Sequence, residues 1–117
     1  MFSGTLNRER PVAFYSFVAS YTVTGTQGLV KDGGTKREAV VKQMTADAGG
    51  KLHAMYFAFG EFDVLGIVEF PDAASAAAMS LAVNASGAVS LRTTLLMTPA
   101  ELDAAAKKTV SYRAPGA

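Results

Sequence analysis

Three cations beside a glycine-rich stretch are the residues most able to bind a ligand. Lys31, Lys36 and Arg37 lie within or just after residues 25–34, whose sequence is GTQGLVKDGG. We predict that a helix begins at Thr35, which places Lys36 and Arg37 in its first turn, where free backbone N–H groups and the helix dipole favour an anion. The three cations could therefore hold a carboxylate or a phosphate. The alternative is that they are solvated side chains that the helix tolerates.

Four further side chains could contribute to a site. His53, the only histidine, would need partners to act as a base or a metal ligand, and its alternative role is that of a half-buried strand residue. Asp63 follows a predicted turn, so it either faces a ligand or accepts hydrogen bonds that fix the turn. Tyr21 and Tyr56 could supply hydroxyl groups to a pocket, although aromatic strand residues more often belong to a core.

No catalytic residues can be assigned from sequence patterns. The chain has no cysteine, which excludes a disulfide, a thiolate metal site and a cysteine nucleophile. The glycines of residues 25–34 fit neither of the common nucleotide-binding spacings, and no His-Glu-x-x-His motif occurs. We therefore expect neither a metal nor a cofactor.

The composition limits the class of protein. A length of 117 residues suits one domain, and a net charge of +1 gives no electrostatic reason to expect nucleic acid or a membrane as a partner. The absence of cysteine fits a reducing cytoplasm. Half of the residues are hydrophobic and only 18% are charged, which is more apolar than one such domain needs. We expect a soluble cytoplasmic protein with apolar surface that a partner covers.

The periodicity of the chain predicts four strands and three helices. Residues 1–10 are expected to be a flexible arm, residues 11–108 the domain, and residues 109–117 an extended tail. The predicted strands are 12–22, 51–59, 62–70 and 88–97, and the predicted helices are 35–48, 72–86 and a short one from 99. Residues 25–34 are interpreted as a connecting loop.

Short local motifs set the expected ends of these elements. Thr35 and Glu38 form a possible capping box, and so do Thr98 and Glu101, with proline following Thr98. Asp72 is the expected N-cap of the second helix, which should end before a glycine. An apolar stripe on the first helix is formed by Val40, Val41, Met44 and Ala48. Residues 60–61 (Gly-Glu) suit a two-residue type II′ turn.

This order predicts an α+β, ferredoxin-like βαββαβ fold with a four-stranded antiparallel sheet and a short C-terminal helix. Two helices cover one face of the sheet. The face predicted to meet them carries His53, Met55, Phe57, Phe59, Phe62, Val64 and Val68. The other face carries Leu52, Ala54, Tyr56, Ala58, Asp63, Leu65, Ile67 and Glu69. Because the second face is also apolar, we predict a homodimer or a higher oligomer with sheets back to back, as in a dimeric α/β barrel.

The chain resembles the GYD domain family over most of residues 12–115. The resemblance is carried by the order of short motifs at residues 21–25, 36–37, 49–52, 56–63, 71–72, 84–87 and 111–113. The family takes its name from a Gly, an aromatic residue and an Asp at the turn; here the aromatic is Phe62, so a tyrosine hydroxyl is absent. Members are similar to dimeric α/β-barrel proteins, which include small monooxygenases and stress-response proteins. The resemblance thus implies a fold and an oligomer but no chemistry.

Three functions remain open. The chain could bind a small molecule that could be anionic, it could be a cofactor-independent monooxygenase- or isomerase-like enzyme with a barrel cavity, or it could be a scaffold. Convergence of His53, Asp63 and a tyrosine in a cavity would favour the enzyme, and a scaffold would have no cavity. We expect the ligand between residues 25–34, the N-terminus of the first helix and the uncovered sheet face, where Tyr56 and Asp63 lie.

Overall fold

The computed structural model describes residues 12–117. The arm predicted at residues 1–10 lies outside this range. The elements are β1 (Ala13–Tyr21), α2 (Val23–Asp32), α3 (Gly34–Asp47), β2 (Lys51–Phe57), β3 (Val64–Phe70), α4 (Ala73–Ala85), β4 (Val89–Leu96) and α5 (Pro99–Ala106). Within the described range, no helix combines the length and the apolar character needed to cross a membrane.

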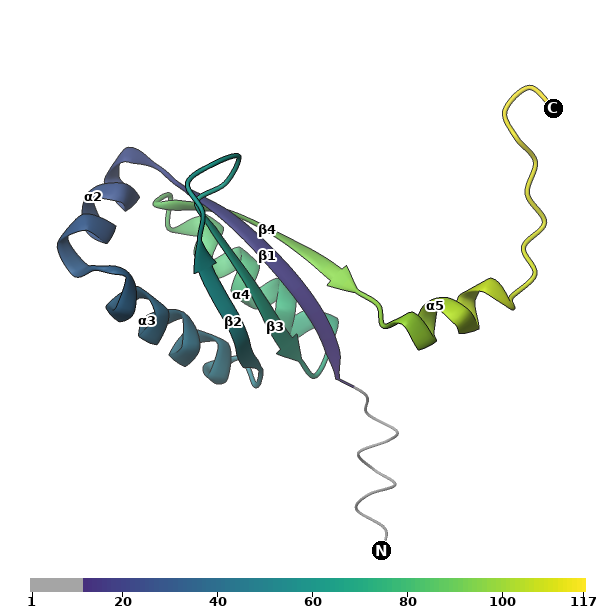
Figure 1. Cartoon of the computed structure of the whole chain (residues 1–117), viewed down its shortest axis with the longest axis horizontal. Helices are drawn as coiled ribbons and strands as arrows, with labels where there is room; N and C mark the ends of the chain where they lie inside the picture. Colours follow the sequence, from purple (N-terminus) through teal and green to yellow (C-terminus); the bar gives the residue numbers. More distant parts are fainter. Residues whose placement is uncertain (1–11) are drawn as a thin grey trace, which may run out of the picture.

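The four strands form one antiparallel sheet in the order β2-β3-β1-β4, so β2 and β4 are its edges. The predicted α+β class and the four-stranded antiparallel sheet are confirmed. Figure 1 shows α2 at one end of the sheet and α5 projecting from the other end of β4, away from the body of the molecule.

The hydrophobic core lies between one face of the sheet and helices α3 and α4. Alternate residues of the strands enter it, as the two-residue period of a strand requires. The buried apolar residues are Tyr15, Phe17, Ala19, Val41, Val64, Val68, Phe70, Ala76, Met79, Val83, Val89 and Leu91. The apolar stripe predicted for the first helix is confirmed at Val41, Met44 and Ala48, which lie in the core or pack against it. It is wrong at Val40, which is 45% exposed. Thr45 takes its place, fully buried because its hydroxyl donates to the Val41 carbonyl at 2.7 Å.

The glycine-rich stretch is a helix, α2, and not the predicted loop. Thr22 is its N-cap, and its hydroxyl accepts a hydrogen bond from the Gly25 amide at 3.2 Å. Gly25 is required by packing, since a Cβ there would overlap the carbonyl oxygen of Ala88. Gly33, with a φ of 84°, ends the helix. The low helix propensity of glycine is thus overridden by a tertiary contact and by a cap.

The first turn of α3 also differs from the expectation. Helix α3 begins at Gly34 with Gly33 as N-cap and no side-chain cap, so the predicted Thr35–Glu38 capping box is wrong. The cause is the close succession of α2 and α3, which leaves a single glycine between them. The Asp32 carboxylate lies 3.6 Å from the Lys36 ammonium, so this pair spans the junction of the two helices.

In the hairpin of β2 and β3, Phe57 pairs with Val64, as the predicted turn at residues 60–61 requires, but the connection is longer than predicted. The strands end at residue 57 and resume at residue 64, so the two-residue turn is wrong. The amide of Ala58 donates to the Asp63 carbonyl at 2.9 Å, and Phe59, 62% exposed, has a φ of 53°. Phe59 therefore lies outside the core that it was predicted to join, and so does Phe62.

A register shift in β2 places Leu52 and His53 on the sheet faces opposite to those predicted for them. The pairing changes between Leu52 and Ala54, as in a β-bulge, because an extra residue enters one strand. Leu52 consequently packs against the core, although it was predicted on the other face. His53 was predicted to face the helices, yet its ring lies 5.0 Å from that of Phe14, a residue outside the core.

The predicted N-terminal caps of α4 and α5 are confirmed. The Asp72 carboxylate caps α4 by accepting from the Ser75 amide at 2.7 Å. The capping box of α5 is present in both directions, with Thr98 and Glu101 joined by hydrogen bonds of 2.8 and 3.1 Å. None of the residues of α5 is buried, and residues 109–117 form neither helix nor strand.

Candidate functional site

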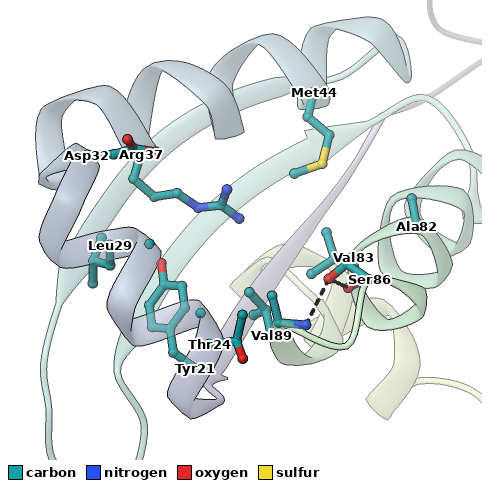
Figure 2. A pocket seen from close by; sticks show the side chains of 13 residues that line it. Tyr21, Thr24, Leu29, Asp32, Arg37, Met44, Ala82, Val83, Ser86 and Val89 are labelled. Carbon is teal, nitrogen blue, oxygen red and sulfur yellow. Dashed lines mark hydrogen bonds between the residues drawn. The ribbon is translucent and has the colours of Figure 1, made fainter.

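A cavity lies on the helical side of the sheet, between α2, α3, α4 and the adjoining ends of β1 and β4. Its volume is about 390 Å³. It is lined by Tyr21, Thr24, Gly25, Gly28, Leu29, Asp32, Arg37, Met44, Ala82, Val83, Ser86, Ala88 and Val89. Figure 2 shows these side chains converging from the three helices and from the strand ends.

The position of α2 explains why the cavity exists. The helix contacts the turn before β4 through Gly25, where backbone approaches backbone. None of its residues is buried, and a Cβ at Gly28 would meet no atom within 4 Å. Helix α2 therefore closes one side of the space without filling it. This wall was missed from the sequence, although Thr22 as an N-cap and Gly33 as a stop are signals that could have predicted the helix.

Arg37 is the cation of this cavity. Its side chain extends from α3 into the space between α2, α3 and α4 (Figure 2). The Nε atom is buried and has no hydrogen-bond partner among residues 12–117. Within residues 12–117, no carboxylate lies within ion-pair distance of the guanidinium. A buried donor of a charged group is costly when it has no acceptor.

The neighbouring charges do not neutralise Arg37. Asp32 lines the cavity but pairs with Lys36, and both side chains are well exposed, at 47% and 67%. Lys31 is exposed in the last turn of α2 and does not line the cavity. Of the three predicted cations, the structure therefore brings only Arg37 to the cavity.

Asp63 makes hydrogen bonds that join the β2–β3 connection to the end of β1. Its carboxylate accepts from the Tyr21 amide at 2.8 Å, and its own amide donates to the Ala19 carbonyl at 2.8 Å. Asp63 does not line the cavity, but Tyr21 does. The carboxylate thus holds the backbone of a cavity residue, which is the structural alternative considered for it.

Tyr56 and His53 lie on the opposite face of the sheet. Tyr56 pairs with Leu65 and is 68% exposed. The Nε2 atom of His53 lies 2.8 Å from a carboxylate oxygen of Glu69. Neither residue lines the cavity of Arg37, so the expected pocket, which combined this face with the helix N-terminus, is not assembled in the single chain.

Comparisons with known proteins identify a family for this chain. The family model of the GYD domain matches residues 15–106. No curated protein matches the chain. A solved structure of a protein of unknown function from Nitrosomonas europaea is 18% identical, with a TM-score of 0.40, over 76% of this chain and 93% of that one.

Proposed function

The chain belongs to the GYD domain family, and we propose that it is a binding protein for a small molecule with a carboxylate or another compact anionic group. The observation that carries this proposal is the buried Nε of Arg37, which has no partner and lines a cavity of about 390 Å³. A carboxylate at that point would accept two parallel hydrogen bonds from the guanidinium.

The ligand should also have a short apolar body. Most of the wall is apolar, with Leu29, Met44, Val83 and Val89 facing the space. Tyr21, Thr24 and Ser86 add three hydroxyl groups, of which that of Ser86 already donates to the Val83 carbonyl. The volume falls in the range of about 300–1,000 Å³ that is usual for small-molecule sites. A monoanion with an aromatic or aliphatic portion would match both the wall and the cation.

Binding is favoured over catalysis by the positions of the titratable side chains. In the described part of the chain, His53, Asp63 and a tyrosine hydroxyl do not converge on the cavity. The monooxygenase- or isomerase-like alternative was expected to bring these residues together as its acid–base groups, and they lie apart. A scaffold would not require the cavity. A cytoplasmic location, in keeping with the absence of cysteine, belongs to the same proposal.

Benzoate and its neutral analogue benzamide test the proposal. In nuclear magnetic resonance titrations, millimolar benzoate should shift the Nε–H signal of Arg37 and the amide signal of Gly28, because both groups border the cavity. Benzamide should shift them several-fold less, since it lacks the charge that the guanidinium recognises. Equal shifts with both compounds, or none with either, would contradict the proposal.

We also propose that the unit is ferredoxin-like and pairs through its uncovered sheet face. The strand order β2-β3-β1-β4 with antiparallel neighbours supports the first part. The second is supported by Leu65 and Ile67, which alternate with the buried residues of β3 and are therefore on the face without helices.

An Ile67→Glu variant should shift the mass measured by light scattering at micromolar concentration towards that of one chain, because it places a charge in the apolar contact. A Val30→Glu variant is the matched control, since Val30 is 80% exposed on α2, away from this face. If both variants keep the mass of the unaltered protein, or if the unaltered protein is a monomer, this face is not the contact.

A further inference from the structure

Helix α5 takes no part in the hydrophobic core that the described residues form. None of its eight residues is buried, and Leu102 is 60% exposed. Figure 1 shows the helix projecting away from the sheet and from the other helices. Isolated helices shorter than about 12–15 residues are marginal in water, so α5 needs a surface to pack against. Leu102, Ala105 and Ala106 follow the spacing i, i+3, i+4 and give it one apolar stripe.

The link to β4 directs α5 outward. Only residues 97–98 separate the two elements. Thr98 is extended, with φ −75° and ψ 160°, and is followed by Pro99 at the start of the helix. Proline disfavours a helical conformation in the residue before it, and the capping box holds Thr98 in place. The cap therefore fixes the first turn of α5 relative to Thr98, and Figure 1 shows the helix continuing outward from the end of β4.

A groove beside β4 offers a suitable surface. It has a volume of about 500 Å³ and lies on the helical side of the sheet, at the β4 edge. Its walls include Ala73, Ala77 and Leu81 of α4 and Leu95 of β4. Leu81 is 71% exposed and Leu95 is 59% exposed. The alanines let a second helix approach α4 closely, and the two leucines would lose apolar surface to it.

We propose that α5 of one chain packs into this groove of a second copy, and that the second copy returns the contact. Leu95 lines the groove and lies two residues before Met97, so the base of α5 and the groove are adjacent in one chain. A two-fold axis near the end of β4 therefore places each α5 over the groove of the other chain and closes the assembly. The helix is short enough for the groove: α5 spans about 12 Å, and the groove wall from Ala73 to Asn84 spans about 18 Å.

Cross-linking between two different single-cysteine chains tests this exchange, since the natural chain has no cysteine. One chain carries Leu81→Cys, and the other, co-produced with it, carries Leu102→Cys. A short bis-maleimide should link them into a covalent heterodimer at several times the yield of the control pair, in which Val30→Cys replaces Leu81→Cys. Both Leu81 and Val30 are more than two-thirds exposed, so the control has matched reactivity.

Two outcomes would overturn the proposal. A heterodimer yield no higher than that of the control would show that α5 does not reach the groove of another chain. A chain with both cysteines that cross-links internally at high dilution, without forming dimers, would show that α5 folds back on its own chain. If the chains paired only through their sheet faces, the Leu81→Cys and Leu102→Cys chains would stay unlinked. Benzoate binding reports on the cavity of Arg37, so its outcome is independent of this cross-link.

A pair of charge variants gives a second measurement without a cross-linker. Leu102→Glu places a carboxylate on the apolar stripe of α5, whereas Ala104→Glu places it on the opposite side of the same helix. Leu102→Glu should raise the dissociation constant of the assembly at least tenfold, and Ala104→Glu should change it less than twofold. Equal effects of the two variants would overturn the proposed orientation of α5.

Discussion

Replacing Arg37 by methionine should weaken benzoate binding roughly 10- to 100-fold, because a hydrogen bond to a charged group contributes about 1.5–3 kcal/mol. The same change should leave the free energy of unfolding of the ligand-free protein unchanged or raise it by up to ~2 kcal/mol, since it removes a buried donor without a partner. Methionine is unbranched and can occupy much of the same path. Isothermal titration and urea unfolding would measure the two effects.

Lys36→Met is the matched control for Arg37→Met. Lys36 is the adjacent cation, but its side chain is 67% exposed and pairs with Asp32 across solvent. Because Lys36 does not line the cavity and solvent screens its charge, benzoate binding should change less than about twofold. Equal losses of binding in the two variants would mean that Arg37 acts only through the overall charge of this region. Lower stability of ligand-free Arg37→Met would mean that the guanidinium is already satisfied.

Replacing Asp63 by alanine should lower the free energy of unfolding by about 2 kcal/mol, with a fall in the melting temperature of about 8 °C. The cause is the Tyr21 amide, which donates to the Asp63 carboxylate at 2.8 Å and would lose its acceptor. Asp63→Asn retains an amide oxygen at the same point and should cost less than half as much. Thermal unfolding monitored by circular dichroism measures both variants.

Glu61→Ala is the control for Asp63, since Glu61 is an exposed acid in the same connection between β2 and β3. Its removal should change the free energy of unfolding by less than about 0.5 kcal/mol. If Asp63→Ala were as stable as Glu61→Ala, the hydrogen bond to Tyr21 would not hold the two strand ends together. Benzoate affinity of the folded Asp63→Asn protein should stay within about threefold of the natural protein, because Asp63 does not line the cavity.

The sequence predicted the parts of the fold that short-range chemistry decides. The N-cap at Asp72 and the capping box of Thr98 and Glu101 are formed within three or four residues, so their partners are visible in the sequence. The alternation of apolar residues in the strands predicted the sheet for the same reason. The pairing of Phe57 with Val64 followed from the adjacency of the two strands.

The errors fall where a distant contact decides the local structure. Position 25 requires glycine because a Cβ there would overlap the carbonyl oxygen of Ala88, 63 positions later. The glycine therefore reflects this packing contact and does not mark a loop. The bulge at His53 could not be read from a regular alternation, because it inserts one extra residue. Arg37 was predicted as an anion ligand for its place in a helix. That α2 and α4 surround it with apolar side chains could be learned only from the tertiary structure.

The wall that α2 provides has a consequence for how a ligand enters. Helix α2 buries none of its residues and contains glycines at 25 and 28, so its separation from the body exposes little apolar surface. Such a segment undergoes subglobal opening at a lower free energy than unfolding of the sheet, and its amides exchange their hydrogens sooner. Ligand entry and release can thus proceed through the transient loss of one short helix, while the sheet and the core stay intact. The rate of binding would then depend on the helix propensity of α2, separately from the affinity that Arg37 provides.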